Sequence, residues 1–550
     1  MRSRFLILAL CTAATALAQV ASFPKPSYFR ETFSRTVTKV ELQAPVKLSD
    51  FVVPGADGKK LELSLRSFLD LVMANNTDIA VSRLTVDVAQ NAITRAFGSF
   101  DPVATGRFVA TQSKTPASDQ LQGATTLATV QQPANFGYNQ LLSSGTNISV
   151  GFNTMKSVSN SDFATFNPSI TSNVTVSFIQ PLIKNRGMYV NRLPITTARS
   201  RLRFTEYALR DTVLQLIMNA ENAYWDLVQA RDTLGVQEKA LQLADAALKR
   251  SELELKLGAM SPLDIFNPQQ NYATAEIGVV QARYLLQQRE DALRKQIGAD
   301  LDPAIRTLPI VLTETADVPA DERKVDVEAA VQTALANRPD LKASVQALDV
   351  DDLQIKTSKN ALLPDLSLLG TYTAQGRGGN FYQTALQPDG TSSFVGIIPG
   401  GFPDALTQMF GFGYPIYQFG LQLRLPIRNR SAAADLSDAM VAKKRDTLTV
   451  RNVEQNARLN VAQAISQLES AKESVRLSLV ALDFGRKYLE AEQKKYELGT
   501  STIFFVLQAN QALVNAESAV VQNKIQYKRS VLNLWRQTGE LLDRRGVAIQ

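Results

Sequence analysis

The acidic residues that could support acid–base chemistry form two short clusters. One contains Glu252 and Glu254, and the other contains Asp349, Asp351 and Asp352. Paired carboxylates can act as general acid and base, but both clusters lie at helical spacing among Lys and Arg, as on solvated helix faces. The chain of 550 residues contains no histidine, the commonest general base and metal ligand. We therefore expect no catalytic residue, no cofactor and no metal site.

The first 18 residues have the features of an export signal. They begin with two arginines, continue as an apolar stretch from Phe5 to Leu17, and end in a small-x-small cleavage site. The only cysteine, Cys11, lies within this segment. Lipidation of Cys11 is an alternative, although Leu10 then stands where a small residue is required. Cleavage after residue 18 would leave a mature chain without disulfides or thiolates.

The remaining composition narrows the possible partners. The formal net charge is only +7, and Lys and Arg are interspersed with Asp and Glu instead of forming a basic block. This pattern does not favour nucleic acid. Beyond the signal, no stretch approaches the ~20 apolar residues of a membrane helix. The sequence thus predicts an exported protein with no helical membrane anchor.

Most of the chain is a duplication. Residues 210–298 align without a gap onto residues 451–539, and an earlier block in which Asn75 matches Asn337 precedes them. Two quasi-equivalent units predict a pseudo-symmetric tube, ring or array. We expect a signal peptide (1–18), a poorly structured N-terminal extension (19–60), a first repeat (61–301), a linker (302–325), a second repeat (326–542) and a C-terminal tail (543–550).

Each repeat is predicted to end in a long helical hairpin. Leucines recur every seventh residue from Leu227 to Leu255, and the second copy keeps this period from Leu468 to Tyr496. A seam of small residues runs beside each, which indicates supercoiled helices that approach closely. The first helix is expected from Val213 to Leu257, about 45 residues. An ordinary bundle of shorter helices is the alternative.

Glycines mark the ends of these long helices. Gly258 and Gly499 each stand where a left-handed cap would stop the helix. Return helices are expected from about Leu263 to Gly298 and from about Phe504 to Gly539. Pro262 is expected in the first turn of the first return helix.

The middle of each repeat changes to a two-residue apolar period, which predicts strands with one wet face and one apolar face. We expect two strands in each half, four in the chain, with long surface loops between them. Four strands cannot close a barrel alone, so their apolar face needs lipid or, alternatively, a soluble core formed with the helices. The apolar positions lie within 148–152, 174–178 and 419–425, the partner strands near 103–112 and 366–373, and the loops at 113–145 and 376–415.

Together these features resemble the TolC family of outer-membrane efflux channels, over about Leu61 to Leu542. The most specific residues follow the family's hairpin-tip pattern, which is roughly G-x-x-[ST]-x-x-D-V-L-x-A-Q. A further likeness is the strand exit Gln180-Pro181-Leu182, echoed by Leu425-Pro426-Ile427. In the second copy the tip residues are Tyr496, Leu498, Gly499, Thr502, Val506, Leu507 and Ala509; in the first they are Leu257, Gly258, Ser261, Asp264, Ile265 and Gln269.

The resemblance implies a fold class that is mainly α with β: duplicated coiled-coil hairpins plus four strands that contribute to a trimeric transmembrane barrel. It implies a homotrimer in outer-membrane lipid whose helices form a periplasmic tunnel, serving tripartite efflux or type I secretion. The tips would contact a periplasmic adaptor protein and, through it, an inner-membrane pump of the RND or ABC type. These implied contacts are Leu257, Gly258, Ser261, Leu498, Gly499 and Thr502.

Some members of this family narrow the tunnel with acidic residues six and nine positions after the tip glycine. Here the first copy has Asp264 and Asn267, and the second has Phe505 and Gln508, so an acidic double ring is incomplete. We expect a mixed constriction formed by Asp264, Phe505 and Gln508. The alternatives are that the glycines only cap helices and that Phe505 belongs to the coiled-coil core.

A non-transport periplasmic adaptor or spacer protein is the main rival. Such a protein would use long helices but would not require amphipathic strands in both halves. The sequence does not identify the exported substrate, the pump, or a role for the N-terminal extension.

Overall fold

The computed structural model describes residues 51–55, 58–116, 125–161, 164–299, 306–318, 325–386 and 392–547. The signal peptide and Cys11 lie outside these residues. The chain divides into two compact units, and each takes segments from both repeats. The sheet unit contains Thr94–Ile195 and Lys356–Leu436, and the helical unit contains Thr196–Ile355, Ser437 onwards and the residues just before Thr94.

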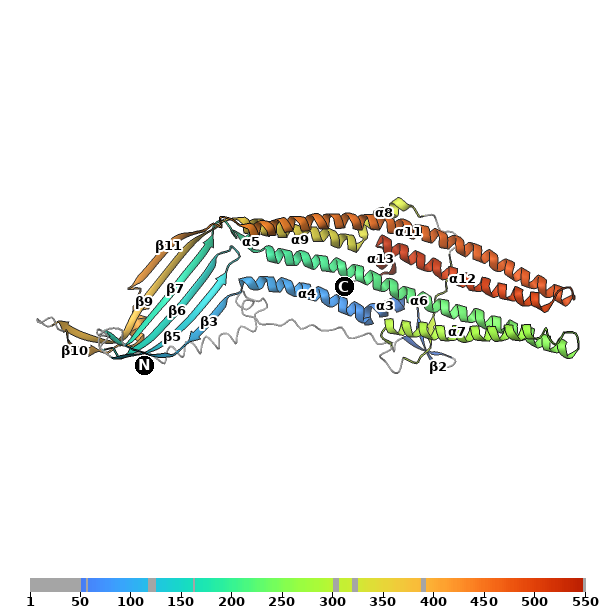
Figure 1. Cartoon of the computed structure of the whole chain (residues 1–550), viewed down its shortest axis with the longest axis horizontal. Coiled ribbons are helices and arrows are strands. Elements are labelled where there is room, and N and C mark those ends of the chain that lie inside the picture. Colours follow the sequence, from blue (N-terminus) through green and yellow to red (C-terminus); the bar gives the residue numbers. More distant parts are fainter. Residues whose placement is uncertain are drawn as a thin grey trace. The chain divides into compact units, whose positions relative to one another are not determined.

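Helices account for the larger part of the chain (Figure 1). The long helices α6 and α11 have 64 and 68 residues, so the expected length of about 45 was too short. The reason is that α6 carries proline only at its second residue, where helices tolerate it, and α11 carries none. The helices are α3 (Leu65–Asn75), α4 (Thr77–Phe97), α5 (Met188–Asn191), α6 (Leu193–Lys256), α7 (Phe266–Gln296), α8 (Val327–Asn337), α9 (Pro339–Leu362), α10 (Phe402–Phe410), α11 (Arg430–Glu497), α12 (Ile503–Thr538) and α13 (Leu541–Arg545).

The seven-residue period predicts part of the packing of the hairpins, since the heptad leucines from Leu234 to Leu255 on α6 are only partly buried. The small residues Ala230 and Ala244 are buried on α6, as are Val475 and Leu489 on α11. Burial of small side chains lets neighbouring helices approach closely. Within the described ranges, no helix combines the length and hydrophobicity needed to cross a membrane.

The first return helix begins later than expected. Pro262 lies in the turn that precedes α7, and Pro268 occupies the first turn of the helix instead. Both positions suit proline, because the first helical turn needs no backbone N–H donor. The second return helix, α12, begins one residue before its expected start.

A small sheet in the helical unit corrects the expected N-terminal extension. Strands β1 (Val52–Gly55) and β2 (Gly58–Leu63) pair antiparallel, and β2 pairs parallel with β8 (Ile310–Leu312) from the expected linker. Within the expected extension, residues 52–55 and 58–60 are therefore strand. Leu61 and Leu63 alternate with polar residues and are buried in the helical core, which explains why this short segment is a strand.

The sheet unit is built on one large sheet (Figure 1). Its order is β10-β9-β7-β6-β5-β3, and the pairing in it is antiparallel throughout. Strand β11 pairs with β9 at one edge, and β4 pairs with β5 at the other. The strands are β3 (Val103–Phe108), β4 (Thr111–Pro116), β5 (Thr126–Leu141), β6 (Asn147–Ser159), β7 (Phe166–Pro181), β9 (Asp365–Leu386), β10 (Ser392–Ile398) and β11 (Pro415–Arg424).

The sheet holds the expected strands, but the two expected loops are wrong. The first contains β5, and the second contains the end of β9, β10 and α10. Apolar residues such as Val130, Phe136 and Tyr138 do alternate along β5, but Gln, Asn, Gly and Pro133 dilute the pattern. Pairing with β6 stabilises β5 from Thr129 to Leu141, and sequence patterns do not report such partners. The path across the described sheet is consequently six strands wide instead of four.

The two faces of this sheet differ in chemistry. On the face that we call the apolar face, Phe136, Phe152, Val174 and Ala374 lie in register on four neighbouring strands. On the opposite, polar face the equivalent row includes Asn153 beside Asn173, whose side chains are hydrogen-bonded at 3.0 Å. The apolar face continues along β11 through the exposed side chains of Tyr417, Phe419, Leu421 and Leu423.

Candidate functional site

The predicted tip residues lie in two turns, one at the end of each hairpin. Gly258 and Gly499 have φ angles of +72° and +73°, and their N–H groups donate to the carbonyls of Leu255 and Tyr496. A side chain added at either glycine would meet nothing within 4 Å. The requirement for glycine therefore comes from the left-handed backbone and not from lack of space.

The apolar tip residues are highly exposed. Leu257 and Leu498 expose 74% and 79% of their surface. Ser261 accepts a hydrogen bond from the N–H of Leu263 at 3.3 Å, and Thr502 occupies the N-cap position of α12. The structure thus presents an exposed leucine beside a tight glycine turn at the end of each hairpin.

The residues expected at the constriction lie close behind these turns. Asp264 is exposed in the turn before α7, and Gln508 is exposed on α12. Phe505 is 46% exposed, and its ring lies 5.6 Å from that of Phe504. Ile503 and Leu507 are instead the buried residues of this turn of α12. Phe505 is therefore not a core residue of its own hairpin.

A contact between Tyr496 and Glu254 joins the ends of the two hairpins, and the sequence did not predict this pairing. The hydroxyl of Tyr496 on α11 donates to Glu254 on α6. The guanidinium of Arg250 lies 4.8 Å from the centre of the Tyr496 ring and pairs with Glu254 at 3.1 Å. Burial, followed by the nearby Glu254 carboxylate, raises the pKa of Tyr496 to about 12. Glu254 is therefore a partner of Tyr496 and not simply part of a solvated face.

A sequence signal for this contact did exist. Tyr496 occupies the heptad position that Leu255 holds in the first copy. A tyrosine in a leucine seam brings a polar hydroxyl into a partly buried layer, where it needs a hydrogen-bond partner. The partner itself lies in the other repeat and was not predictable from the heptad.

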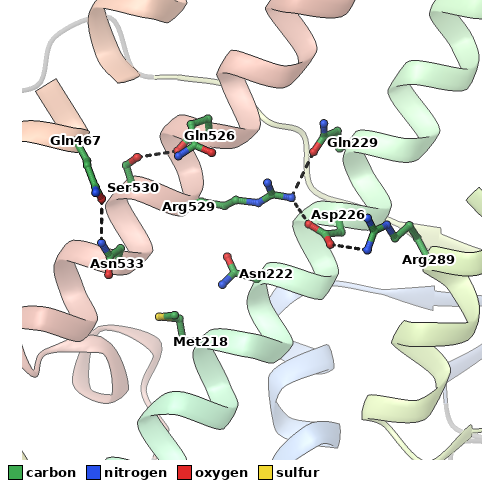
Figure 2. Close-up of a pocket in the computed structure, with 10 residues that line it drawn as sticks. All are labelled: Met218, Asn222, Asp226, Gln229, Arg289, Gln467, Gln526, Arg529, Ser530 and Asn533. Atoms are coloured by element: carbon green, nitrogen blue, oxygen red, sulfur yellow. Dashed lines mark hydrogen bonds and ion pairs between the residues drawn. The ribbon is translucent and has the colours of Figure 1, made fainter. Parts of the chain in front are cut away.

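A charged cluster joins the hairpins farther from the tips (Figure 2). Asp226 on α6 pairs with Arg289 on α7 at 3.0 Å and with Arg529 on α12, which also donates to Gln229 at 3.3 Å. These residues line a cleft of about 610 Å³. The carboxylate of Asp226 thus forms ion pairs with Arg289 and Arg529, which lie on different hairpins. The full lining comprises Met218, Asn222, Asp226, Gln229, Arg289, Gln467, Gln526, Arg529, Ser530 and Asn533.

This cluster breaks the pseudo-symmetry of the repeats. The positions equivalent to Asp226 and Arg289 are Gln467 and Ser530 in the second copy. Gln467 accepts a neutral hydrogen bond from Asn533 at 3.3 Å. The first hairpin therefore has an ion pair at Asp226, and the second has a hydrogen bond between two amide side chains at the equivalent Gln467. Among the described residues, no three His, Cys, Asp or Glu side chains are grouped to hold a metal ion.

Comparison with known sequences identifies the class of this protein. The profile of the family described as outer membrane efflux protein matches residues 145–299 and 330–540, more than half of the chain. The chain belongs to the outer membrane efflux protein family. The TolC-family resemblance and the expected TolC-like class, mainly α with β, are thereby confirmed, with a wider sheet than the four strands expected.

Individual relatives are distant. The chain is 21% identical over 338 residues to the probable efflux pump outer membrane protein TtgC of Pseudomonas putida, covering 61% of this chain and 62% of TtgC. It is 23% identical over 479 residues to outer membrane efflux protein BepC of Brucella suis, covering 87% and 85%. The alignment thus spans less than two thirds of TtgC but most of BepC.

Solved structures support the fold. The CmeC outer membrane channel of Campylobacter jejuni matches with a TM-score of 0.60 at 16% identity, covering 87% of this chain and 86% of that one. Similarity at this level of identity shows the fold alone.

Proposed function

We propose that this protein is the outer-membrane channel of a tripartite efflux or type I secretion system. The observation that carries the proposal is a sheet with an exposed apolar face, a polar opposite face and unpaired edges, joined in one chain to two long helical hairpins. The apolar face faces lipid and the polar face lines a water-filled lumen. A periplasmic adaptor or spacer protein would have no use for such a sheet.

The edges of the sheet support closure by oligomerisation. Exposed edge strands carry unpaired N–H and C=O groups, which lipid cannot satisfy. The six-strand path ends in β3 at one edge and in β10 and β11 at the other. Because the strands alternate in direction, β3 of one chain and β11 of the next run antiparallel and can pair head to tail. Counted along the described six-strand path, three such chains form a barrel eighteen strands around, in place of the twelve that the family resemblance implies.

The helical unit supplies the periplasmic tunnel in this proposal. Its hairpin tips bind a periplasmic adaptor, and the adaptor connects them to an inner-membrane pump of the RND or ABC type. This part is supported by the exposed Leu257 and Leu498 at the tips and by TtgC, whose name assigns it to an efflux pump.

Cysteine cross-linking across the sheet edges tests the assembly. In a Cys11→Ser background, Thr105→Cys on β3 is combined with Gln418→Cys, Gly420→Cys or Gln422→Cys on β11, all of which lie on the polar face. One combination should yield a covalent trimer on oxidation, because neighbouring edge strands place same-face side chains within about 5.5 Å.

The matched control combines Thr105→Cys with Phe419→Cys, which points to the opposite face and should not cross-link. The purified trimer should also conduct ions across a planar lipid bilayer. A monomeric mass by light scattering, or extraction from cells without detergent, would contradict the proposal and favour the periplasmic adaptor.

A further inference from the structure

We propose that α10 (Phe402–Phe410) and the aromatic residues that follow it insert into the membrane–water interface on the lipid side of the sheet. The inference rests on the proposed function, which places the apolar face against lipid. It adds a helical lipid-contact element that lies outside the sheet itself. The partner is lipid at the boundary between head groups and acyl chains.

The helix α10 packs directly on the apolar face of the sheet. A side chain added at Gly376 on β9 would come 2.0 Å from the carbonyl oxygen of Ala405, and one at Gly378 would come 2.1 Å from that of Gly401. Ala405 and Met409 are the buried residues of the helix. Two glycines on one face of β9 thus make room for the backbone of α10. Gly376 and Gly378 share their face with Ala374, which lies in the apolar row.

The two ends of α10 differ in character. At its start, the N–H of Gly401 donates to Asp404 at 2.7 Å, and the N–H of Gly400 donates to Asn380 at 3.4 Å. Beyond its end, the ring of Phe412 lies 6.3 Å from that of Tyr372, whose ring lies 5.2 Å from that of Tyr417 on β11. The helix therefore runs along β9 from a capped end, where Phe402 is also exposed, to the aromatic end of the apolar face.

The aromatic end is exposed and continuous. Phe410, Phe412 and Tyr414 expose 63%, 60% and 60% of their surface and lead directly into Tyr417 and Phe419. Single exposed apolar residues need no explanation, but a contiguous cluster marks a contact surface. Phenylalanine and tyrosine rings are enriched where the lipid of a membrane meets water.

The backbone at Phe412 supports a role for its ring. Phe412 has a φ angle of +52° and stands between Gly411 and Gly413. A bulky residue in this left-handed region costs about 1 kcal/mol or more, which glycine would avoid. The chain therefore holds an aromatic side chain at a position where its backbone favours glycine.

The charge of this segment indicates which part of the lipid it contacts. Between Phe402 and Phe419, Asp404 is the only charged residue. A segment without Lys or Arg has no cation to pair with lipid phosphates, so its contact is through aromatic and apolar surface. Asp404 lies at the capped end of α10 and is exposed there.

Nitroxide labels test this arrangement in the full chain reconstituted into phosphatidylcholine vesicles. Single cysteines replace Phe410, Tyr414 and Asp404 in a Cys11→Ser background, and collisions with oxygen and with a water-soluble nickel chelate are measured. Labels at Phe410 and Tyr414 should collide more with oxygen than with nickel, and the label at Asp404 should show the reverse. All three sites are exposed, and only Asp404→Cys removes a hydrogen bond, the one that Asp404 accepts from the N–H of Gly401.

Two reference labels separate this inference from the proposed function. Leu421→Cys lies on the apolar face and Gln422→Cys on the polar face of β11. If the label at position 421 collides mainly with the nickel chelate, the apolar face lies in water and the proposed function is wrong. If Leu421 is in lipid but Phe410 and Tyr414 collide mainly with nickel, α10 lies in water and this inference is wrong. Protection of Phe410 and Tyr414 from both reagents would show that protein covers them, which also overturns it.

Discussion

The hydroxyl of Tyr496 donates a hydrogen bond to the carboxylate of Glu254, so the ends of α11 and α6 are joined although 242 positions separate the two residues. Tyr496→Phe removes this bond but keeps the ring beneath Arg250. We expect a loss of about 1 kcal/mol in local stability, the usual net worth of one hydrogen bond. Amide hydrogen exchange should accelerate near the ends of both helices.

The exposed Tyr488 on the same helix provides the control, since Tyr488→Phe should leave exchange unchanged. The pKa of Tyr496, raised to about 12, means that its hydroxyl stays protonated at neutral pH. The associated stability is complete below pH 10 and declines as pH rises towards 12. Identical exchange in wild type and Tyr496→Phe would show that the bond does not hold the ends together.

The glycines and leucines at the tips allow capping to be separated from adaptor binding. Gly258→Ala and Gly499→Ala should each destabilise their hairpin by about 1 kcal/mol, because alanine is strained at positive φ. Leu257→Ser and Leu498→Ser should leave stability unchanged, since both side chains are exposed. If the leucines bind the adaptor, their replacement should reduce adaptor cross-linking in cells. Unchanged cross-linking in the double serine variant would leave the tips with a capping role only.

Conductance in planar bilayers tests the proposed constriction. Asp264→Asn should weaken cation selectivity, because a trimer would lose three carboxylates near its axis. Phe505→Ala should raise conductance if the ring narrows the entrance, and Gln508→Ala should act in the same direction. Phe504→Ala is the matched control, an equally exposed neighbour at a position that the family does not use. Unaltered currents in the Asp264 and Phe505 variants would place the constriction elsewhere.

The Asp226 cluster should contribute to cohesion between the hairpins. Asp226→Asn leaves Arg289 and Arg529 without their shared carboxylate, at a cost of about 1–2 kcal/mol for a half-buried pair. Arg529→Gln should cost more than Arg289→Gln, because the Arg529 side chain is the more buried of the two. The melting temperatures of the purified variants measure the relative cost of these substitutions. Gln467→Ala at the equivalent position in the second copy should have a smaller effect than Asp226→Asn.

Asp351 should make stability depend on pH. Burial, followed by the adjacent Asp446, raises the pKa of the Asp351 carboxyl above its usual value of 3.8. The folded state therefore holds a proton that the unfolded chain has released, and stability falls as pH rises through this interval. Asp351→Asn should raise the melting temperature at pH 7 and flatten its dependence between pH 4 and pH 7. A variant no more stable than wild type at pH 7 would contradict the raised pKa of the Asp351 carboxyl.

Local periodicity was sufficient to predict the helical hairpins. The seven-residue spacing of Leu227 and its successors and the glycines at 258 and 499 are properties of short windows, because a helix satisfies its backbone hydrogen bonds within itself. The duplication, the family and the alternating strands of the sheet were equally evident from the sequence. Helix ends were less accurate, since α6 begins twenty residues before the expected Val213.

Contacts between distant segments were decided only by the tertiary structure. Strand β5 is a strand because β3, β4 and β6 pair with it, and its own Gln, Asn and Pro residues conceal the alternation. Tyr496 was visible as an irregular heptad residue, but Glu254 became its partner only when α6 and α11 came together. Likewise, Gly376 and Gly378 appeared typical of a loop until α10 packed against them. In each case the stabilising free energy comes from contact between two segments that are distant in the sequence. A short window of sequence contains only one of these two segments.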